Sequence, residues 1–287
     1  MSRGEAIVNK VGFYPGCSLT GTSREYSESV RAIARKLRLE LHEVSDWNCC
    51  GATAAHSINK ELSQALPARI LALAERDGMT ELVVPCAACY NRLMCTQAAL
   101  RGKEAAIGET LGMAYSGKIQ ILNVLQWVER YVMPCLPDVE SLFPKKKVAC
   151  YYGCLLVRPK EVLRFDRLED PQSMDEIMRM LGAEPLDWAF KTECCGAGFS
   201  ISRTQSVARL SAGIIDDAAA RGAEGIVVAC PMCHSNLDMR RAACLKAGLN
   251  AQYKDIPVIY ITQAIGLALG IGRKELGLNR HFVPVKL

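Results

Sequence analysis

The sequence predicts two duplicated Rossmann-like α/β domains with parallel sheets, related by a pseudo-twofold axis. Two observations carry this prediction: short apolar segments alternate with amphipathic helical segments, and one set of motifs occurs twice along the chain. Such alternation is typical of β-α-β units, which build parallel sheets. A chain of 287 residues, half of them hydrophobic, is long enough for two domains that each bury a core.

The repeat is carried by cysteine motifs that follow in the same order in both halves. The matching cysteines are Cys17 and Cys154, Cys49 and Cys194, and Cys86 and Cys230, at offsets of 137, 145 and 144 residues. Three matches at nearly one offset indicate a duplication, with its join near Leu142 to Lys147. We therefore expect an N-terminal domain over residues 1–145 and a C-terminal domain over residues 146–287.

In the first half, each expected strand is a short apolar run, and the first long helix places Val30, Ile33 and Leu37 on one face. A proline at position 67 should interrupt the helical sequence that follows the first Cys-Cys pair. The expected strands are Val11–Tyr14, Leu39–Val44, Glu81–Val84 and Ile119–Leu122. The expected helices are Ser23–Leu37, the stretch up to Glu75, the stretch from the Cys-x-x-Cys pair to about Leu100, and Val124–Val132.

The second half repeats this order. Ser173 followed by Glu176 has the spacing of a capping box, which favours a helix start at Ser173. The expected strands are Val148–Tyr151, Glu184–Leu186, Gly225–Val228 and Val258–Tyr260. The expected helices are Ser173–Leu181, Thr204–Arg221, Met232–Ala247 and Thr262–Leu269.

Composition excludes several classes of protein. No apolar run approaches the ~20 residues of a membrane span, and Met1–Lys10 lacks the apolar core of a secretory signal, so we expect a soluble, cytoplasmic protein. The net charge of +5 is spread along the chain, and the one basic run, Lys145–Lys147, is interpreted as a linker rather than a nucleic-acid patch. The absence of G-x-G-x-x-G and P-loop motifs argues against flavin or nicotinamide in this chain.

Cysteine is the unusual component. Fourteen cysteines without an export signal favour metal or redox chemistry over a disulfide framework. The four outside the repeat (Cys95, Cys135, Cys150 and Cys244) are interpreted as small buried hydrophobic residues. The ten within it are Cys17, Cys49, Cys50, Cys86, Cys89, Cys154, Cys194, Cys195, Cys230 and Cys233.

Each repeat supplies five thiols at points where a strand ends or a helix begins. The carboxyl ends of parallel strands meet at one edge of the sheet, so five thiols per half should converge there. A structural zinc or a cubane [4Fe–4S] cluster takes four cysteines. The adjacent pairs Cys49-Cys50 and Cys194-Cys195 cannot easily chelate one ion, because neighbouring side chains diverge. Five thiols with such a pair favour a larger cluster.

The repeated pattern resembles the CCG domain, and its two copies resemble the B subunit of heterodisulfide reductase. The segments that carry the resemblance read Tyr-Tyr-Gly-Cys-Leu-Leu from Tyr151, and Val-Ala-Cys-Pro-Met-Cys from Val228, followed by Ser-Asn-Leu from Ser235. The resemblance extends over nearly the whole chain, from Phe13 to about Phe282. Other two-copy CCG proteins serve glycolate, lactate and quinone-linked dehydrogenases, and often carry a ferredoxin-type region that is absent here.

The resemblance implies one noncubane [4Fe–4S] cluster in each half, with the disulfide substrate between the two. It implies that Cys17, Cys49, Cys50, Cys86 and Cys89 hold the N-terminal cluster. The resemblance likewise implies that the C-terminal cluster is held by Cys154, Cys194, Cys195, Cys230 and Cys233.

The resemblance also implies an oxidoreductase that acts on sulfur groups, in which each cluster supplies one electron to one sulfur. The substrate would be a disulfide such as CoM-S-S-CoB, or, in the reverse direction, sulfur bound to lipoate. Electrons would come from a ferredoxin-like C subunit with cubane clusters and from a flavin-containing A subunit. The C-terminal stretch Leu276–Leu287 is either part of that interface or packs on its own domain. By sequence proximity to the cysteine motifs, His56 and His234 are candidate proton donors.

Two other hypotheses stay open. The chain could be an electron-relay subunit of a dehydrogenase with no disulfide substrate of its own. Alternatively, one half could hold a structural zinc, although both halves carry the same five cysteines.

Overall fold

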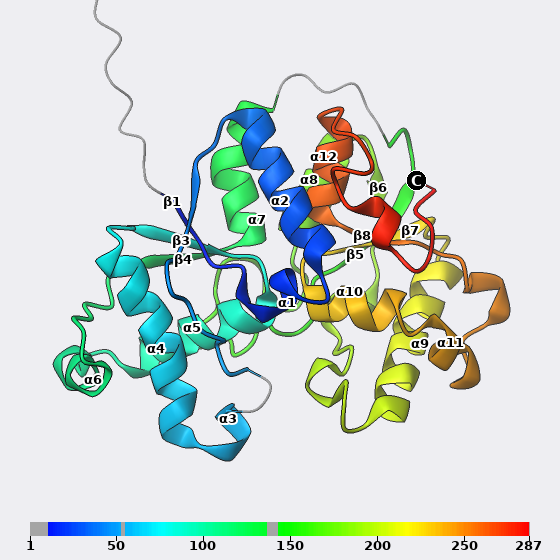
Figure 1. Cartoon of the computed structure of the whole chain (residues 1–287). Coiled ribbons are helices and arrows are strands. Elements are labelled where there is room, and N and C mark those ends of the chain that lie inside the picture. Colours follow the sequence, from blue (N-terminus) through cyan, green and yellow to red (C-terminus); the bar gives the residue numbers. More distant parts are fainter. Residues whose placement is uncertain (1–10, 53–54, 137–142, 287) are drawn as a thin grey trace, which may run out of the picture.

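Two parallel sheets of four strands form the centre of the molecule (Figure 1). The computed structural model describes residues 11–286 apart from 53, 54 and 137–142. The first sheet consists of β1 (Val11–Phe13), β2 (Leu41–Glu43), β3 (Glu81–Val84) and β4 (Gln120–Asn123). The second consists of β5 (Lys147–Tyr151), β6 (Glu184–Pro185), β7 (Gly225–Val228) and β8 (Val258–Tyr260).

Both sheets have the same strand order, β2-β1-β3-β4 and β6-β5-β7-β8, with every neighbouring pair parallel. Equal order in two consecutive halves confirms the predicted duplication of a Rossmann-like unit. The exact division between residues 145 and 146 stays a prediction.

The helices cover both faces of each sheet (Figure 1). In the first half they are α1 (Gly16–Thr20), α2 (Arg24–Leu37), α3 (Ala55–Ile58), α4 (Lys60–Arg76), α5 (Ala87–Ala99), α6 (Glu104–Leu111) and α7 (Val124–Trp127), which continues as a π-helical turn over Val128–Val132. In the second half they are α8 (Ser173–Met180), α9 (Thr204–Ala220), α10 (Pro231–Asp238), α11 (Arg241–Lys246) and α12 (Ile261–Ala268).

The two halves pack through α2 of the first and α12 of the second, which lie side by side between the sheets (Figure 1). The rings of Tyr26 and Tyr260 stack with centroids 4.1 Å apart, and the hydroxyls of Ser29 and Thr262 lie 2.7 Å apart. All four side chains are buried. The halves therefore share a core rather than being joined by a linker alone.

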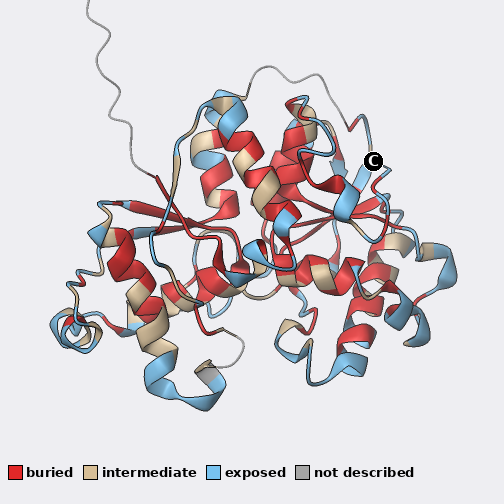
Figure 2. Ribbon diagram, viewed as in Figure 1, coloured by how far each residue is buried: buried red, intermediate tan, exposed pale blue. Residues whose placement is uncertain are grey.

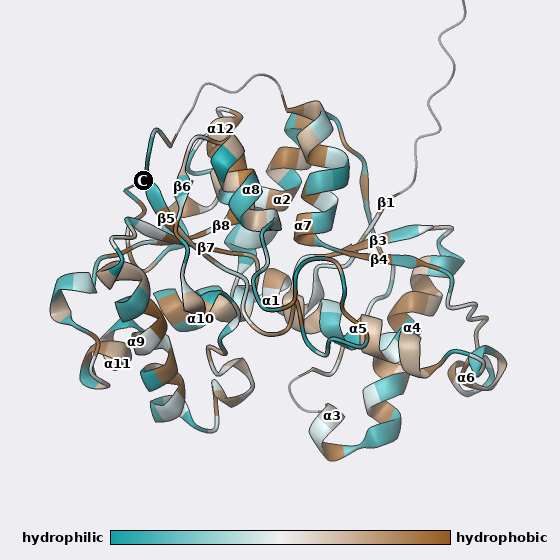
Figure 3. Ribbon diagram, turned by 180° about the vertical axis from the view of Figure 1, so that it is seen from behind, coloured by the Kyte–Doolittle hydropathy of each residue, from teal (hydrophilic) through white to brown (hydrophobic). Residues whose placement is uncertain are grey.

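The strands supply the most buried part of the core (Figure 2). Every residue of β1, β3, β7 and β8 is buried, and apart from Glu81 and the glycines of β1 and β7 these residues are apolar or aromatic. Brown segments mark these strands in Figure 3. Continuous apolar runs are expected for parallel strands, because helices cover both faces of the sheet. The sheets are thus rigid supports for the loops at their carboxyl ends.

Three expectations on helices were wrong. Pro67 lies inside α4 instead of interrupting it, because the apolar residues after it are buried and packing outweighs the lost hydrogen bond. The expected helix 232–247 is two helices, with a break after Asp238. Ser173 makes no capping box: Gln172 precedes the helix, and the Ser173 hydroxyl is buried without a hydrogen-bond partner.

Among the described residues, none of the helices is both long enough and apolar enough to cross a membrane.

Candidate metal centre between the two halves

The ten repeated cysteines lie at the carboxyl ends of three strands in each sheet. Cys17 follows β1, Cys49 and Cys50 follow β2, and Cys86 and Cys89 follow β3. In the second half the equivalent cysteines follow β5, β6 and β7. The structure therefore confirms the predicted convergence, since β1, β2 and β3 are neighbours in one sheet.

The thiols of each half are linked by short sulfur–sulfur contacts. In the first half, Cys17 and Cys49 have their sulfurs 3.9 Å apart, and Cys50 and Cys89 have theirs 3.2 Å apart. The thiols of Cys86 and Cys89 are close enough to shift each other's pKa.

The second half repeats these pairs. The sulfurs of Cys195 and Cys233 are 3.7 Å apart. The thiols of Cys154 and Cys194 shift each other's pKa, and so do those of Cys230 and Cys233. The two halves thus arrange their thiols in the same way.

The two sets of thiols meet across the seam between the halves. Cys86 precedes α5 and Cys230 precedes α10, and their thiols are close enough that each shifts the pKa of the other, upward for Cys86 and downward for Cys230. Both are buried, and the hydroxyl of Tyr26 donates to the carbonyls next to them, Pro85 at 3.4 Å and Ala229 at 3.2 Å. A single buried residue of α2 therefore holds both Cys-x-x-Cys turns in register.

The thiols differ in exposure and acidity in a way that both halves share. Cys49 and Cys194, the first residues of the adjacent pairs, are exposed, whereas their neighbours Cys50 and Cys195 are buried. Hydrogen bonds from the Cys17 and Cys50 thiols and the Gly51 N–H lower the pKa of Cys49 to about 2. A hydrogen bond from the Cys154 thiol, together with backbone N–H groups, lowers the pKa of Cys194 to about 6.

The same thiol–thiol contacts raise the pKa of the partner cysteines. The thiol contact with Cys49 raises the pKa of Cys50 to about 11. The contact with Cys194, burial and neighbouring thiols raise the pKa of Cys154. When one thiol of a set is ionised, its negative charge raises the pKa of the others. A metal cation at the site would offset this effect, because it favours the thiolate form of every neighbouring cysteine.

A glycine in each half makes room for a thiol. Gly16 and Gly153, each directly before the first cysteine of its repeat, have φ values of +62° and +68°. A Cβ at Gly16 would lie 3.1 Å from the sulfur of Cys89, and one at Gly153 would lie 2.9 Å from the sulfur of Cys233. Only glycine combines this backbone conformation with so close an approach.

Sequence reasoning missed two tyrosines that position the adjacent cysteine pairs. The hydroxyl of Tyr14 donates to the carbonyl of Asn48 at 2.8 Å, and that of Tyr151 donates to the carbonyl of Glu193 at 2.6 Å. Each accepting residue directly precedes a Cys-Cys pair. The repeat itself could have identified them, because both tyrosines stand three residues before the first cysteine of their repeat.

The thiols form a chain of pairs rather than a compact group of four. Among the described residues, only one group of side chains brings three ligand-type atoms within 4.8 Å of one another, and it contains no cysteine. A tetrahedral zinc site places its sulfur ligands about 3.8 Å apart, as follows from a Zn–S distance of ~2.3 Å. The described thiols therefore do not form the compact set of four that a tetrahedral zinc site requires.

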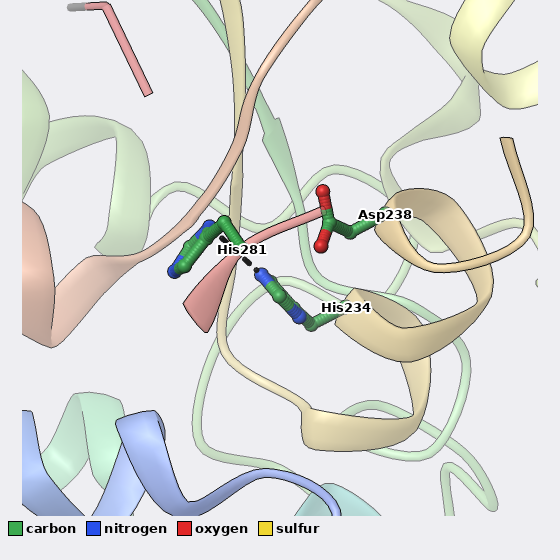
Figure 4. A group of neighbouring side chains, drawn as sticks. All are labelled: His234, Asp238 and His281. Atoms are coloured by element: carbon green, nitrogen blue, oxygen red, sulfur yellow. Dashed lines mark hydrogen bonds between the residues drawn. The ribbon is translucent and has the colours of Figure 1, made fainter. Parts of the chain in front are cut away.

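That compact group consists of His234, Asp238 and His281 (Figure 4). His234 Nε2 and His281 Nδ1 lie 3.3 Å apart, and the Asp238 carboxylate accepts the backbone N–H groups of Phe282 and Val283 at 2.8 and 3.0 Å.

The hydrogen bonds of Gln263 fix the proton of His281. Its Oε1 accepts from the backbone of Tyr260 and its Nε2 donates to the carbonyl of Leu276, both at 3.0 Å. The same Nε2 donates to His281 Nε2 at 2.9 Å, so the His281 proton lies on Nδ1 and is donated to the Val258 carbonyl at 2.9 Å. His281 Nδ1 therefore has no free lone pair for a metal. The hydrogen bonds of His234, Asp238 and His281 hold the C-terminal segment against the domain instead.

The C-terminal stretch packs mainly on its own chain. Leu276, Leu278, Val283 and Val285 are buried against the protein. Within the described part of this stretch, Phe282 is the one large exposed hydrophobic residue, at 65%. The stretch was expected either to form an interface with another subunit or to pack on its own domain, and most of its residues pack on their own domain.

The two predicted histidines lie in different settings. His234 is buried, its ring stacks on Tyr260 with centroids 4.3 Å apart, and burial holds its pKa well below the usual range. It lines a cavity of about 200 Å³ together with Glu25 and Arg280. His56 belongs to α3, and its side chain lies outside what the structure describes.

A second cavity, of about 280 Å³, lies on the seam between the halves. Its lining includes Ala88 and Arg92 from α5 of the first half and Cys154, Cys194 and Met232 from the second. It is mostly apolar and reaches two of the repeated thiols.

The cysteines outside the repeat are not all buried. Cys150 and Cys244 are buried, as expected, whereas Cys95 is half-buried and Cys135 is exposed. The expectation was wrong for Cys135, which lies in the short turn after the π-helical segment.

Comparison with known proteins finds the pattern of the cysteine-rich CCG domain twice, at residues 11–94 and 148–238. A Wolinella succinogenes protein named 8-methylmenaquinol:fumarate reductase membrane anchor subunit is 33% identical over 275 residues, which cover 94% of this chain and 96% of that protein. The B subunit of a ferredoxin/F420H2-dependent CoB-CoM heterodisulfide reductase from Methanosarcina acetivorans is 27% identical over 286 residues, 96% of this chain and 94% of the relative.

A solved structure shares the fold. The crystal structure of a hypothetical protein from Helicobacter pylori superposes with a TM-score of 0.80 at 14% identity, over 97% of this chain. This chain spans about half, 52%, of the length of that protein.

Proposed function

The chain belongs to the family of proteins with the cysteine-rich CCG domain, which it carries twice, and we propose that it is the iron–sulfur subunit of a heterodisulfide reductase-like complex. In this proposal it reduces a disulfide, or runs in reverse on thiols, at two noncubane [4Fe–4S] clusters. The observation that carries the proposal is the pair of five-thiol sets that meet at Cys86 and Cys230.

The donor set fits such clusters. Cys17, Cys49, Cys50, Cys86 and Cys89 would hold the first, and Cys154, Cys194, Cys195, Cys230 and Cys233 the second. Backbone N–H groups already donate hydrogen bonds to two of these sulfurs, from Gly51 to Cys49 at 3.4 Å and from Gly196 to Cys194 at 3.3 Å. Donors of this kind tune iron–sulfur centres and orient their ligands.

When bound, the two clusters would supply the two electrons that cleavage of a disulfide requires. Other residues of the chain orient the cysteines and keep water away from the reacting sulfur. The tyrosines Tyr14 and Tyr151 orient the adjacent cysteine pairs, and the apolar lining of the cavity on the seam excludes water from a bound sulfur compound. Because that cavity is lined from both halves, a substrate there would contact both.

Two protons must accompany the two electrons if thiols are released. His56 and His234 remain the proton donors of this proposal, and His234, which lines the cavity of about 200 Å³ rather than the cavity on the seam, would act through intervening groups. Replacement of either by glutamine should flatten the pH profile of disulfide reduction without removing iron, whereas an unchanged profile would exclude that histidine.

The electrons would enter from other proteins of the complex. We propose a ferredoxin-like C subunit with [4Fe–4S] cubanes, served in turn by a flavin-containing A subunit, in a complex located in the cytoplasm. Co-purification of the native protein tests this: a lone chain that reduces a disulfide with NADH alone would contradict it.

A second candidate function is favoured by the Wolinella relative, whose name describes a quinol:fumarate reductase. In that case the chain would be an electron-relay subunit of a quinone-linked dehydrogenase, with no disulfide substrate.

The two candidates are separated by an anaerobic assay with reduced methyl viologen and an organic disulfide. Disulfide reduction predicts one molecule of disulfide cleaved for every two electrons consumed, loss of this activity in Cys194→Ser, and full activity in Cys135→Ser, which changes an exposed cysteine outside the repeat. Bound iron that exchanges electrons with a quinol while no thiol is formed would favour the relay.

A further inference from the structure

Arg92 breaks the symmetry of the two halves. It stands three residues after Cys89, where the second half has Asn236 three residues after Cys233. Asn236 is buried, and its amide donates to the carbonyl and the sulfur of Cys195, at 3.2 and 3.4 Å. Arg92 makes no such bond among the described residues; it lines the cavity on the seam instead.

The position of Arg92 is fixed by its neighbour. The guanidinium donates to Asn91 Oδ1 at 3.0 Å. Asn91 is buried, and its Nδ2 donates to the carbonyls of Arg158 at 2.5 Å and Leu155 at 3.3 Å, in the second half. The same side chain thus joins α5 to the opposite half and holds the guanidinium at the cavity.

The guanidinium has no anionic partner within the described ranges. In the part of the chain that the structure describes, Arg92 forms no ion pair, and it is the one charged residue in the lining of this cavity. The rest of the lining is alanine, glycine, leucine, phenylalanine, methionine and two cysteines. A half-buried guanidinium in apolar surroundings favours an anion, which it binds through paired N–H groups.

We propose that Arg92 is a specificity-determining residue that binds an anionic group of the substrate, so that this cavity accepts sulfur compounds with an apolar arm ending in a carboxylate or similar acid. The proposal rests on the proposed function for the sulfur chemistry, but the anion site stands on its own geometry. The sulfur end would lie toward Cys154 and Cys194, which line the same cavity. A volume of about 280 Å³ suits a small molecule or one arm of a larger one.

Lipoate and lipoamide are suitable probes, because they share a dithiolane and an aliphatic arm and differ in a carboxylate against a neutral amide. We expect the anaerobic protein to bind lipoate about 10-fold or more tightly than lipoamide in equilibrium dialysis, since charge-assisted hydrogen bonds to a partly buried group are strong. Arg92→Met should abolish that preference, and Arg92→Lys should keep part of it. The matched control is Arg203→Met, which removes an exposed arginine near the cavity that stacks on Phe199 at 6.0 Å.

In turnover with reduced methyl viologen, Arg92→Met should raise KM for lipoate by a similar factor, leave KM for lipoamide unchanged, and leave kcat near the original value. Equal binding of lipoate and lipoamide by the original protein, or equal loss of both in Arg92→Met, would overturn the proposal. If lipoate binds through Arg92 but is never reduced, the anion site stands and the disulfide reductase function fails.

Discussion

Gly153 shows how a single residue can decide whether a centre forms. Its φ is +68°, and a Cβ added to it would lie 2.9 Å from the sulfur of Cys233, which leaves no space for alanine. Gly153→Ala should cost about 1–2 kcal/mol in backbone conformation alone and displace the Cys233 thiol. We expect iron in the anaerobic protein to fall to about half, because only the C-terminal site is disturbed.

Gly213→Ala is the matched control, since a Cβ there meets nothing within 4 Å and its φ is not positive. This variant should keep all its iron. Full iron content in Gly153→Ala would mean that the C-terminal thiols are not the ligands.

At the residue scale, spacing alone identified the ten cysteines that the fold brings together, because each follows a strand of a parallel sheet. The supporting residues were not predictable in the same way. Tyr14 and Tyr151 hold repeated positions before a cysteine, but the carbonyls that they reach are 34 and 42 residues away. Arg92 differs in sequence from its counterpart Asn236, but the cavity that it lines is built from both halves. Such contacts depend on tertiary packing, which a single sequence does not encode locally.

Lys191 connects two elements next to the C-terminal thiols. It is 3% exposed, and its ammonium lies 3.1 Å from the Asp175 carboxylate of α8, which is itself 1% exposed. Its carbonyl accepts the N–H groups of Tyr152 and Gly153, at 2.9 and 3.0 Å. The lysine therefore ties α8 to the turn that carries Cys154.

Lys191→Met would leave Asp175 buried without this cation, and removal of one partner of a buried pair costs about 3–5 kcal/mol. We expect a clearly lower urea midpoint in anaerobic unfolding followed by circular dichroism. Lys146→Met, which breaks the exposed pair with Glu224, should change stability by less than about 1 kcal/mol. Similar midpoints for the two variants would show that the Lys191–Asp175 pair is not important for stability.

At the element scale, the apolar strands were predictable and several helices were not. Glu81–Val84, Gly225–Val228 and Val258–Tyr260 match their predicted bounds, because short apolar runs between turns have few alternatives in a parallel sheet. The short helices α1 and α6 were not predicted, and α4 continues through Pro67. These depend on burial against neighbouring elements, which outweighs local propensity.

The whole molecule depends on contact between its halves. Ser29 of α2 and Thr262 of α12 are both fully buried, with their hydroxyl oxygens 2.7 Å apart. Ser29→Ala should cost about 1–3 kcal/mol, because it leaves the Thr262 hydroxyl without this partner. The double variant Ser29→Ala/Thr262→Val should regain most of that loss, since both polar groups are then absent. Additive losses in urea unfolding would mean that the two hydroxyls do not stabilise the seam together.

The duplication itself was predictable from the repeated motifs, but the closeness of the two sets of thiols was not. Only the packing of α2 against α12 and the double hydrogen bond of Tyr26 bring Cys86 to Cys230. Two sets of thiols that lie this close together can act on one substrate, and this is the central claim for the molecule.

The most direct test is the iron, acid-labile sulfide and zinc content of the protein purified without oxygen. Two four-iron clusters predict about eight irons and a similar amount of sulfide per chain, with little zinc. Replacement of Cys17 and Cys154 by serine, one at a time, should each remove about half of the iron. A protein purified in this way with bound zinc and no acid-labile sulfide would contradict the account.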